Sequence, residues 1–421
     1  MNDRPEKKVA NPIVLIGLYL YICREFESRI YNYPTNGMAD KFYGRILVLI
    51  FTLFSGFALA SSDHAAPEGE KGGFKAGEMI MHHIGDSHDW HIMDLKNPDG
   101  TDHPISVPLP IIIYSVDDGF SVFLSSAFHH GTAAKNRYVL DHGHIYRLGE
   151  NNPYADAEHL DLEEAYGMGY VSEDLAGVFS GTPGAFVDLS ITKNAAAILF
   201  SLVLLVLIMV SVAKAYQKRP GSEPTGLQNM METIIVFVRD DIAKSAIGPK
   251  YEKFMPFLLS IFFFIWLNNI LGLVPIVPGG ANVTGNIAVP LVLALFTFVI
   301  TTINGNAHYW KHIVAMPGVP KPVLLLLTPI EVMQIFIRPI VLMIRLFANI
   351  TAGHISVLVF FSLIFIFQEK SDVAGWGVSV ASVAFTIFLN LLELLVGAIQ
   401  AYVFTLLSAI YFGMAVAEES H

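Results

Sequence analysis

The sequence contains a single cysteine, Cys23, among 421 residues. One thiol cannot form a disulfide within the chain, and it cannot supply a cysteine-ligated zinc site. Charged residues are also scarce, at 15%, whereas hydrophobic residues reach 53% and the mean hydropathy is +0.52. Soluble proteins of this size are rarely so apolar. Because the apolar residues come in blocks long enough to cross a bilayer, we expect a membrane protein.

Basic residues and nucleotide-binding or protease motifs are likewise lacking. Lys and Arg number 26 against 37 Asp and Glu, so the formal net charge is −11. A nucleic acid partner is not expected, because phosphate binding needs concentrated basic surface. The sequence has no G-x-x-x-x-G-K-[ST] loop for a nucleotide and no H-E-x-x-H helix of an intramembrane metalloprotease. We therefore expect no nucleotide site of the chain's own.

The first 60 residues are interpreted as a leader region. The stretch "MADKFYGRILVLIFTLFSGFALA" at 38–60 has two basic residues, a short apolar run and a final Ala-Leu-Ala. This order is typical of a cleaved secretory signal, which makes Met38 the expected natural start. The alternative is that the stretch is a first membrane helix.

Residues 61–190 are expected to form a small β-rich extracytoplasmic domain, exported behind that signal. The runs "PISVPLPIIIYSV" and "GFSVFLSS" are strand-like and are separated by turn residues. The region is rich in His and Asp, and "HHIGDSHDWHIMD" places His88 and His91 one helical turn apart. These two are candidate metal ligands. The alternative is a polar segment at the membrane surface that binds no metal.

Residues 191–421 are expected to form an all-α polytopic membrane domain of about five helices. Two spans are long, and a charged segment before the second span is expected to be an amphipathic interfacial helix. The predicted spans are 191–213, 254–275, 286–304, 322–368 and 375–412, with the amphipathic helix at 226–250. Lys and Arg cluster after the first span, so that side is expected to be cytoplasmic. The N-terminal domain is then outside and the C-terminus inside.

The last two segments are too long to cross hydrocarbon perpendicularly. As helices they would measure roughly 70 and 57 Å, whereas the hydrocarbon core is about 30 Å thick. We predict two tilted helices paired as a hairpin about the polar turn "QEKSDVAG" at 368–375.

Polar residues on these segments follow helical spacing. Glu331, Arg338, Arg345 and Asn349 form one stripe, and Glu393 and Gln400 form another on the second helix. Arg345 lies too far from either end to reach water, and a central arginine costs roughly 2.5–3.5 kcal/mol on insertion scales.

Folding the hairpin at its polar turn brings these residues together. The pair His354 and Glu393 and the pair Arg345 and Gln400 are both centred on that turn. An antiparallel hairpin therefore sets His354 beside Glu393 and Gln400 beside Arg345.

The run "RLFANITAGH" at 345–354 resembles the arginine-bearing helix of subunit a of the rotary F-type ATP synthases. The resemblance also includes "WLNNILGLVP" at 266–275, "NVTGNIAV" at 282–289 and "AYVFTLLSAIYFGMA" at 401–415. It covers about 190–421 together with the histidine-bearing start of the exported part. Subunit a is the stationary membrane subunit beside the rotating c-ring. The resemblance therefore implies a stator proton-channel subunit with two offset half-channels, with no cofactor and no catalytic site of its own.

The resemblance implies a role for each polar position. Arg345 would face the c-ring carboxylate and block a direct leak, with Gln400 holding it in place. The outer half-channel would be lined by His354, Glu393, Asn269 and Asn349. Glu331 would lie on the cytoplasmic exit path, and Arg338 would be a supporting residue. Gly272 departs from the family pattern, since many members have an aspartate there.

The expected partners are the c-ring, b-type peripheral stalk subunits, the other ATP synthase subunits and the lipid bilayer. Protons are the expected ion, with Na⁺ left open because the c-subunit site decides it. The expected location is the bacterial inner membrane. The alternative function is an ion-coupled secondary transporter, in which buried charge also marks a pathway.

Overall fold

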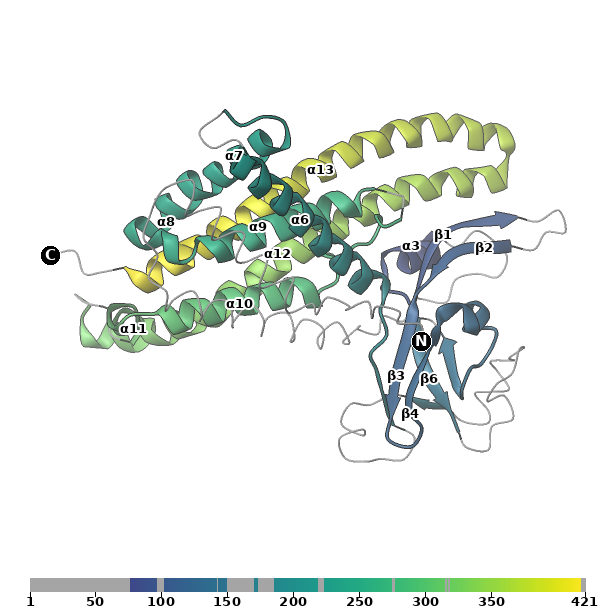
Figure 1. Ribbon diagram of the computed structural model, residues 1–421, viewed down its shortest axis with the longest axis horizontal. Helices are drawn as coiled ribbons and strands as arrows, with labels where there is room; N and C mark the ends of the chain where they lie inside the picture. The colour runs from purple at the N-terminus through teal and green to yellow at the C-terminus, as the bar shows by residue number, and fades with distance from the viewer. Residues whose placement is uncertain are drawn as a thin grey trace, which may run out of the picture.

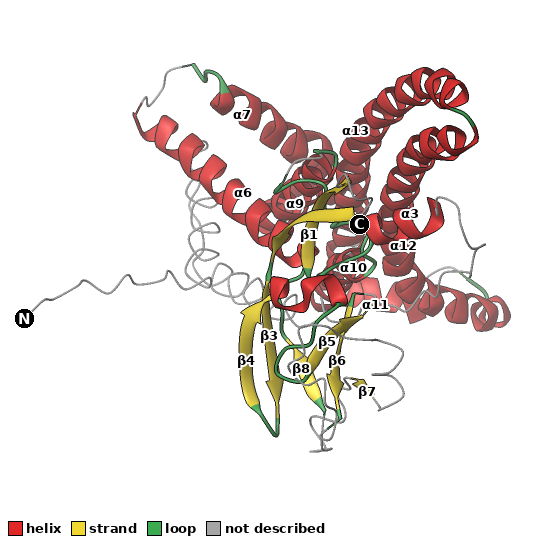
Figure 2. Ribbon diagram, turned by 90° about the vertical axis from the view of Figure 1, so that its right-hand side faces the viewer, coloured by secondary structure: helices red, strands yellow, loops and turns green. Residues whose placement is uncertain are grey.

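The computed structural model describes residues 76–96, 102–141, 143–149, 170–172, 185–218, 223–274, 277–314, 316 and 319–417. A β-containing N-terminal part lies at one end of a larger group of helices (Figures 1 and 2). The leader expected over residues 1–60, with its start at Met38, falls outside the described residues.

The N-terminal part begins with helix α3 (Ala76–Ile84) and continues as short antiparallel strands. These strands are β1 (Asp89–Lys96), β2 (Asp102–Pro108), β3 (Pro110–Ser115), β4 (Gly119–Leu124), β5 (Tyr138–Asp141), β6 (His144–Leu148), β7 (Tyr170–Ser172) and β8 (Phe186–Asp188). Within the described residues they form a β1-β2 pair and two three-stranded sheets, ordered β4-β3-β8 and β5-β6-β7. The β-rich character expected of this region is confirmed.

A small core joins the two three-stranded sheets. Ile111 and Ile113 of β3 are fully buried with Tyr138 of β5 and Phe186 of β8. Arg147 of β6 is also buried, and its guanidinium donates hydrogen bonds to carboxylates in the β3–β4 turn. A buried charge is tolerated when it is paired in this way.

The helical part contains the predicted membrane spans. Its helices are α6 (Lys193–Lys218), α9 (Met255–Gly272), α10 (Ala288–Asn304), α11 (Ala307–Val314), α12 (Lys321–Lys370) and α13 (Asp372–Val416). Four helices of the described residues are long and apolar enough to cross a membrane, and a fifth span results if the α10–α11 pair, bent by 103°, counts as one. This agrees with the prediction of about five membrane helices.

The segment predicted as one amphipathic helix at 226–250 is helical but irregular. It comprises α7 (Leu227–Phe237), the π-helical turn η2 (Val238–Lys244), α8 (Ser245–Ile247) and the 3₁₀ turn η3 (Gly248–Lys253). Gly248 has φ of 75°, a left-handed conformation that ends α8 and that glycine adopts without strain.

Helices α12 and α13 form the predicted hairpin, lying side by side along their length (Figure 1). Their 50 and 45 residues correspond to about 75 and 68 Å. The chain reverses at Ser371, whose extended backbone separates the two helices. Pro329 and Pro339 lie inside α12 without ending it.

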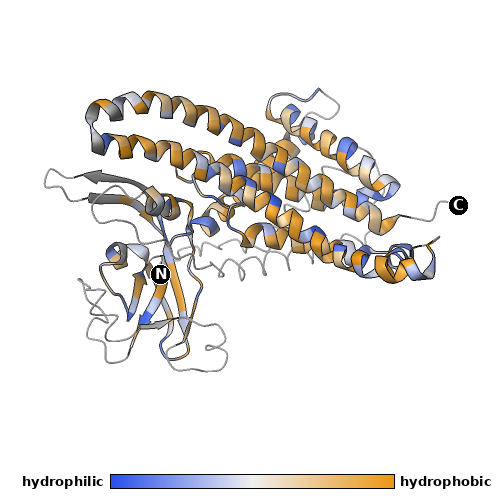
Figure 3. Cartoon of the chain, turned by 180° about the vertical axis from the view of Figure 1, so that it is seen from behind, coloured by the Kyte–Doolittle hydropathy of each residue, from blue (hydrophilic) through white to orange (hydrophobic). Residues whose placement is uncertain are grey.

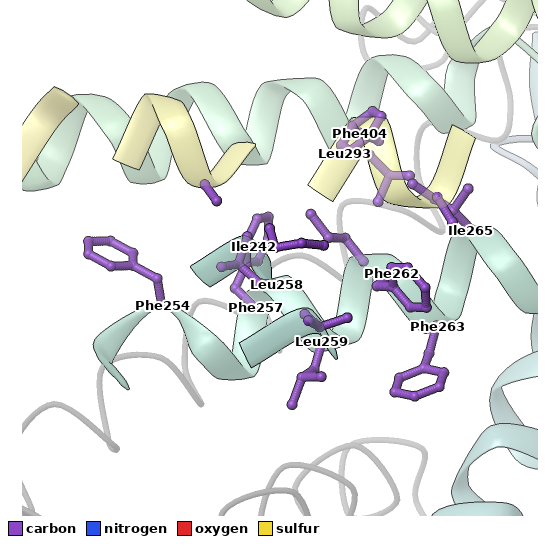
Figure 4. Close-up of a cluster of buried hydrophobic side chains, with 14 of the residues drawn as sticks. Ile242, Phe254, Phe257, Leu258, Leu259, Phe262, Phe263, Ile265, Leu293 and Phe404 are labelled. Atoms are coloured by element: carbon purple, nitrogen blue, oxygen red, sulfur yellow. The ribbon is translucent and has the colours of Figure 1, made fainter. Parts of the chain in front are cut away.

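Helix α9 lies at the centre of the helical core, in contact with α6 and α13. Figure 4 shows several of the buried side chains of this core. Phe254, Leu258 and Ile265 are fully buried there. The ring of Phe254 stacks on Phe412 of α13 at 4.8 Å between centroids. Aromatic packing of this kind fixes α13 against the shorter helices.

The hairpin surface away from this core is mostly apolar (Figure 3). Large hydrophobic side chains are exposed on α12, such as Leu325 and Leu326, and on α13, such as Val380 and Leu391. An apolar surface of this extent is typical of a protein that contacts lipid or other apolar helices.

Candidate functional site

A histidine and a glutamate meet between the two long helices. The Nε2 atom of His354 on α12 lies 3.5 Å from the Oε1 atom of Glu393 on α13. The pairing predicted from the hairpin register is therefore confirmed. Both side chains are largely shielded, with exposed fractions of 17% for His354 and 5% for Glu393.

The Glu393 carboxyl fits against α12 because Gly353 has no side chain. A Cβ atom at position 353 would lie 2.9 Å from Oε1 of Glu393, closer than real Cβ contacts. Among the described residues, none donates a hydrogen bond to either carboxylate oxygen of Glu393. A neighbouring imidazole is a partner with which a carboxyl can exchange a proton.

Gly272 also adjoins this pair. An added Cβ at position 272 would lie 3.6 Å from Nε2 of His354 and 3.2 Å from the carbonyl oxygen of Ala281. The position at which many family members have an acid therefore faces the same histidine. In this chain the neighbouring carboxylate comes from α13.

Asn269 ties α9 to its neighbours. Its Nδ2 donates to the carbonyl of Gly397 at 3.0 Å, and its Oδ1 accepts a hydrogen bond from Thr284 at 2.6 Å. The side chain is buried, and Gly397 allows α13 to approach it closely. Asn269 thus holds α13 in register one turn beyond Glu393.

Arg345 and Asn349 lie on a different face of α12. Both are exposed, and they are one helical turn apart. His354 is nine positions after Arg345, which corresponds to about two and a half turns, so the two side chains leave the helix on opposite sides. Gln400 on α13 is buried, and its pairing with Arg345 stays a prediction.

The two remaining charged positions lie toward the start of α12. Arg338 donates from Nη2 to Oε1 of Gln334 at 3.2 Å, and its guanidinium lies 5.8 Å from the ring centroid of Tyr411. Such contacts agree with a supporting position. Glu331 is partly buried, and its place on an exit path stays a prediction.

The candidate metal pair His88 and His91 in the N-terminal part depended on a helical spacing that is wrong. His91 lies in strand β1, which pairs with β2, and His88 comes directly before that strand. The ring nitrogens of His88 already contact Gly143 O at 3.0 Å and Asp188 Oδ2 at 2.9 Å. No group of three or more metal-binding side chains occurs among the described residues.

The His88–Asp188 pair is instead a structural contact. Burial disfavours the charged imidazole, but the hydrogen bond to Asp188 and its charge outweigh this effect and raise the pKa of His88. Burial likewise opposes the charge on Asp188, yet His88 lowers the pKa of that carboxyl. The pair attaches β8, which leads into α6, to the segment that precedes β1.

Sequence reasoning missed the contacts made by Gly353, Thr284 and Lys193. Lys193, at the start of α6, is buried and donates to the carbonyl of His83 at 3.1 Å. A lysine at the boundary of an apolar span reads as an interfacial anchor, so its sequence position alone gave no signal. The glycine directly before His354 is the sequence signal for the close approach of α13.

Comparisons with known proteins agree with this arrangement. The family model described as ATP synthase A chain matches residues 196–413, and a second model, described as a domain of unknown function, matches residues 79–166. The chain is 43% identical over 238 residues to "ATP synthase subunit a" of Chloroherpeton thalassium, covering 56% of this chain and 69% of the relative.

Two further relatives carry the same name. The protein of Chlorobium phaeobacteroides (strain DSM 266) is 46% identical over 239 residues, or 56% of this chain and 67% of the relative. That of Anaeromyxobacter sp. (strain Fw109-5) is 35% identical over 279 residues, or 62% and 65%. These names do not support the alternative of a secondary transporter.

Proposed function

The chain belongs to the ATP synthase A chain family, and from this membership we propose that it is the stationary proton-conducting subunit of a rotary ATP synthase. It is a multi-pass membrane protein. Its task is to pass protons to and from the carboxylates of a rotor through two offset half-channels. Its sequence has no G-x-x-x-x-G-K-[ST] loop, and we assign ATP chemistry to other subunits of the complex.

The observation that carries this proposal is an arginine exposed at mid-length on an apolar helix. Arg345 lies on the outer face of α12, where its neighbours Val341 and Ile344 are also exposed. A guanidinium keeps its proton at any reachable pH. Exposed to lipid it would be costly, so the face is suited to a partner that brings an opposite charge.

That partner is the c-ring, whose carboxyl becomes ionised when it arrives opposite Arg345. A nearby cation lowers the pKa of an acid, so the rotor carboxyl releases its proton there. The same charge repels a proton that would cross directly. Protons must then move with the ring, and each releases about 2.3 kcal/mol per 100 mV of membrane potential.

His354 and Glu393 carry protons on the outer side. Their 3.5 Å separation and their burial support a relay, since an imidazole can take a proton at one nitrogen and release one from the other. Asn269 positions α13 beside this relay, and Asn349 lines the path toward the rotor. Gln400 orients Arg345 from the facing helix.

The opposite half-channel begins near Glu331, with Arg338 supporting α12 beside it. The peripheral stalk of b-type subunits holds the chain against the turning ring. We place the N-terminal part outside the bacterial inner membrane and the C-terminus in the cytoplasm, and we expect H⁺ as the ion.

The proposal is tested with the whole complex in energised inverted membrane vesicles. We expect Arg345→Ala to abolish ATP synthesis while the subunit still copurifies with the rotor. Arg345→Lys is expected to fail as well, because a desolvated lysine can lose its proton. The matched control is Arg338→Lys, in which lysine can keep the contacts to Gln334 and Tyr411.

Normal synthesis by Arg345→Ala vesicles would overturn the proposal. Purification of the chain as a lone oligomer, with no ATP synthase subunits attached, would favour the transporter alternative.

A further inference from the structure

The N-terminal part meets the membrane helices at a junction built from α3, the start of α6 and α12. Helix α3 lies against α12 (Figure 2). Lys193 fixes the end of α3, because its Nζ donates to His83 O at 3.1 Å and its backbone N–H donates to Ser87 O at 2.8 Å. Asp86 accepts a hydrogen bond from the N–H of Asn194 at 3.0 Å.

This junction lies next to the His354–Glu393 pair. His354 interacts electrostatically with both His83 and Lys193. A third imidazole therefore belongs to the surroundings of the pair, and it comes from a part of the chain that precedes the first membrane helix.

Exposure to water falls stepwise along these groups. The side chain of His83 is exposed, that of His354 is 17% exposed, and that of Glu393 is 5% exposed. A proton can leave bulk water by short steps when titratable side chains form a series from the solvent to a buried carboxyl. His83, His354 and Glu393 have this arrangement.

A group of charged and polar residues next to α3 fixes the position of His83. Lys193 is buried and interacts with Asp86, which in turn interacts with His88. His88 is bonded to Asp188 on β8. The N-terminal part is thus anchored to α6 by several polar contacts, so α3 is held at one place against α12.

We propose that His83 is the outermost group of the proton path, and that the N-terminal part thereby forms the mouth of the outer half-channel. This inference rests on the proposed function. The neutral imidazole of His83 takes a proton from water at one nitrogen and releases a proton from the other toward His354. His354 passes a proton to the Glu393 carboxylate, and each imidazole returns to its neutral form. Lys193 and Asp86 are positioning residues.

Passive proton conduction by complexes stripped of their catalytic head tests this. Reconstituted vesicles receive a potassium diffusion potential, and inward proton flow is measured from the side that carries the N-terminal part. We expect His83→Ala to slow conduction by about tenfold, because water replaces a positioned proton carrier only partly. His83→Gln, which keeps a polar side chain of similar size, is expected to be equally slow. His129→Ala, at an exposed histidine elsewhere in the same part, should conduct normally.

Added imidazole separates a proton carrier from a packing residue. Because His83 is exposed, we expect buffer imidazole to restore conduction in His83→Ala. Normal conduction by both His83 variants would overturn the inference, and so would slow conduction that imidazole leaves unchanged. Glu393→Gln in the same vesicles tests the proposed function itself. If it blocks conduction while the His83 variants do not, only the inference fails, and if it conducts normally, the proposed relay fails.

Discussion

At the scale of single residues, the candidate site combines two shielded groups with one exposed cation. His354 and Glu393 come from different helices, yet their side chains occupy the same space between α12 and α13. Gly353 and Gly272 leave that space open on two sides. The chemistry of such a pair depends on contact between one imidazole and one carboxyl. It depends much less on whether the imidazole is on α12 or on α13.

An exchange of the two side chains tests this point. The single variants His354→Glu and Glu393→His each place two like groups together, and we expect proton-driven ATP synthesis to fall at least about tenfold. The double variant restores one acid and one imidazole, so it should recover a substantial fraction of the rate. Synthesis is measured in inverted vesicles with equal amounts of assembled complex. A double variant no better than the poorer single variant would contradict the relay.

The sequence predicted the His354–Glu393 pair because residues at equal distances from the turn of an antiparallel helical hairpin face each other. It did not predict the bonds of Asn269 to Gly397 and Thr284, which depend on how α9 docks onto α13. The helical spacing predicted for His88 and His91 was wrong because it, too, depended on contacts between distant segments. A three-residue interval fits a helix, but pairing with β2 makes that segment a strand.

At the scale of elements, glycines determine how closely α13 approaches its neighbours. A Cβ at Gly413 would lie 2.1 Å from the carbonyl oxygen of Ala246, so α8 packs directly on the backbone of α13. The hairpin was predictable from segment length and its polar turn. The π-helical turn at Val238–Lys244 and the α10–α11 bend were not, because neither follows from the spacing of apolar residues.

Substitution at this contact should loosen the helical core. We expect Gly413→Val to destabilise the folded protein by about 1–3 kcal/mol, because the clash involves backbone and cannot be relieved by a rotamer change. Gly377→Val is the matched control, since a Cβ there meets no atom of the described residues within 4 Å. Thermal unfolding of the detergent-purified complex measures both. Equal unfolding temperatures for the two variants would show that the α8–α13 contact contributes little.

At the scale of the whole molecule, the N-terminal part is fixed to the membrane helices by continuous structure. Leu189 and Ile191 donate backbone hydrogen bonds to Ile112 and Pro110 of β3, so sheet pairing continues almost to the start of α6. The polar junction at Lys193 adds a second attachment. Domain and helices are therefore expected to keep one orientation, which the channel mouth requires.

Five crossings, with the α10–α11 pair counted as one span, put the two ends of the described chain on opposite sides of the membrane. We expect a membrane-impermeant thiol reagent to label Ser126→Cys, an exposed position of the N-terminal part, in intact cells whose outer envelope is permeable to it. Ala417→Cys, exposed just after α13, should react only after the inner membrane is opened. Both are made in a Cys23→Ser background, which removes the native thiol. Labelling of both positions in intact cells would mean an even number of crossings and a C-terminus outside the cytoplasm, which would contradict the count of five spans.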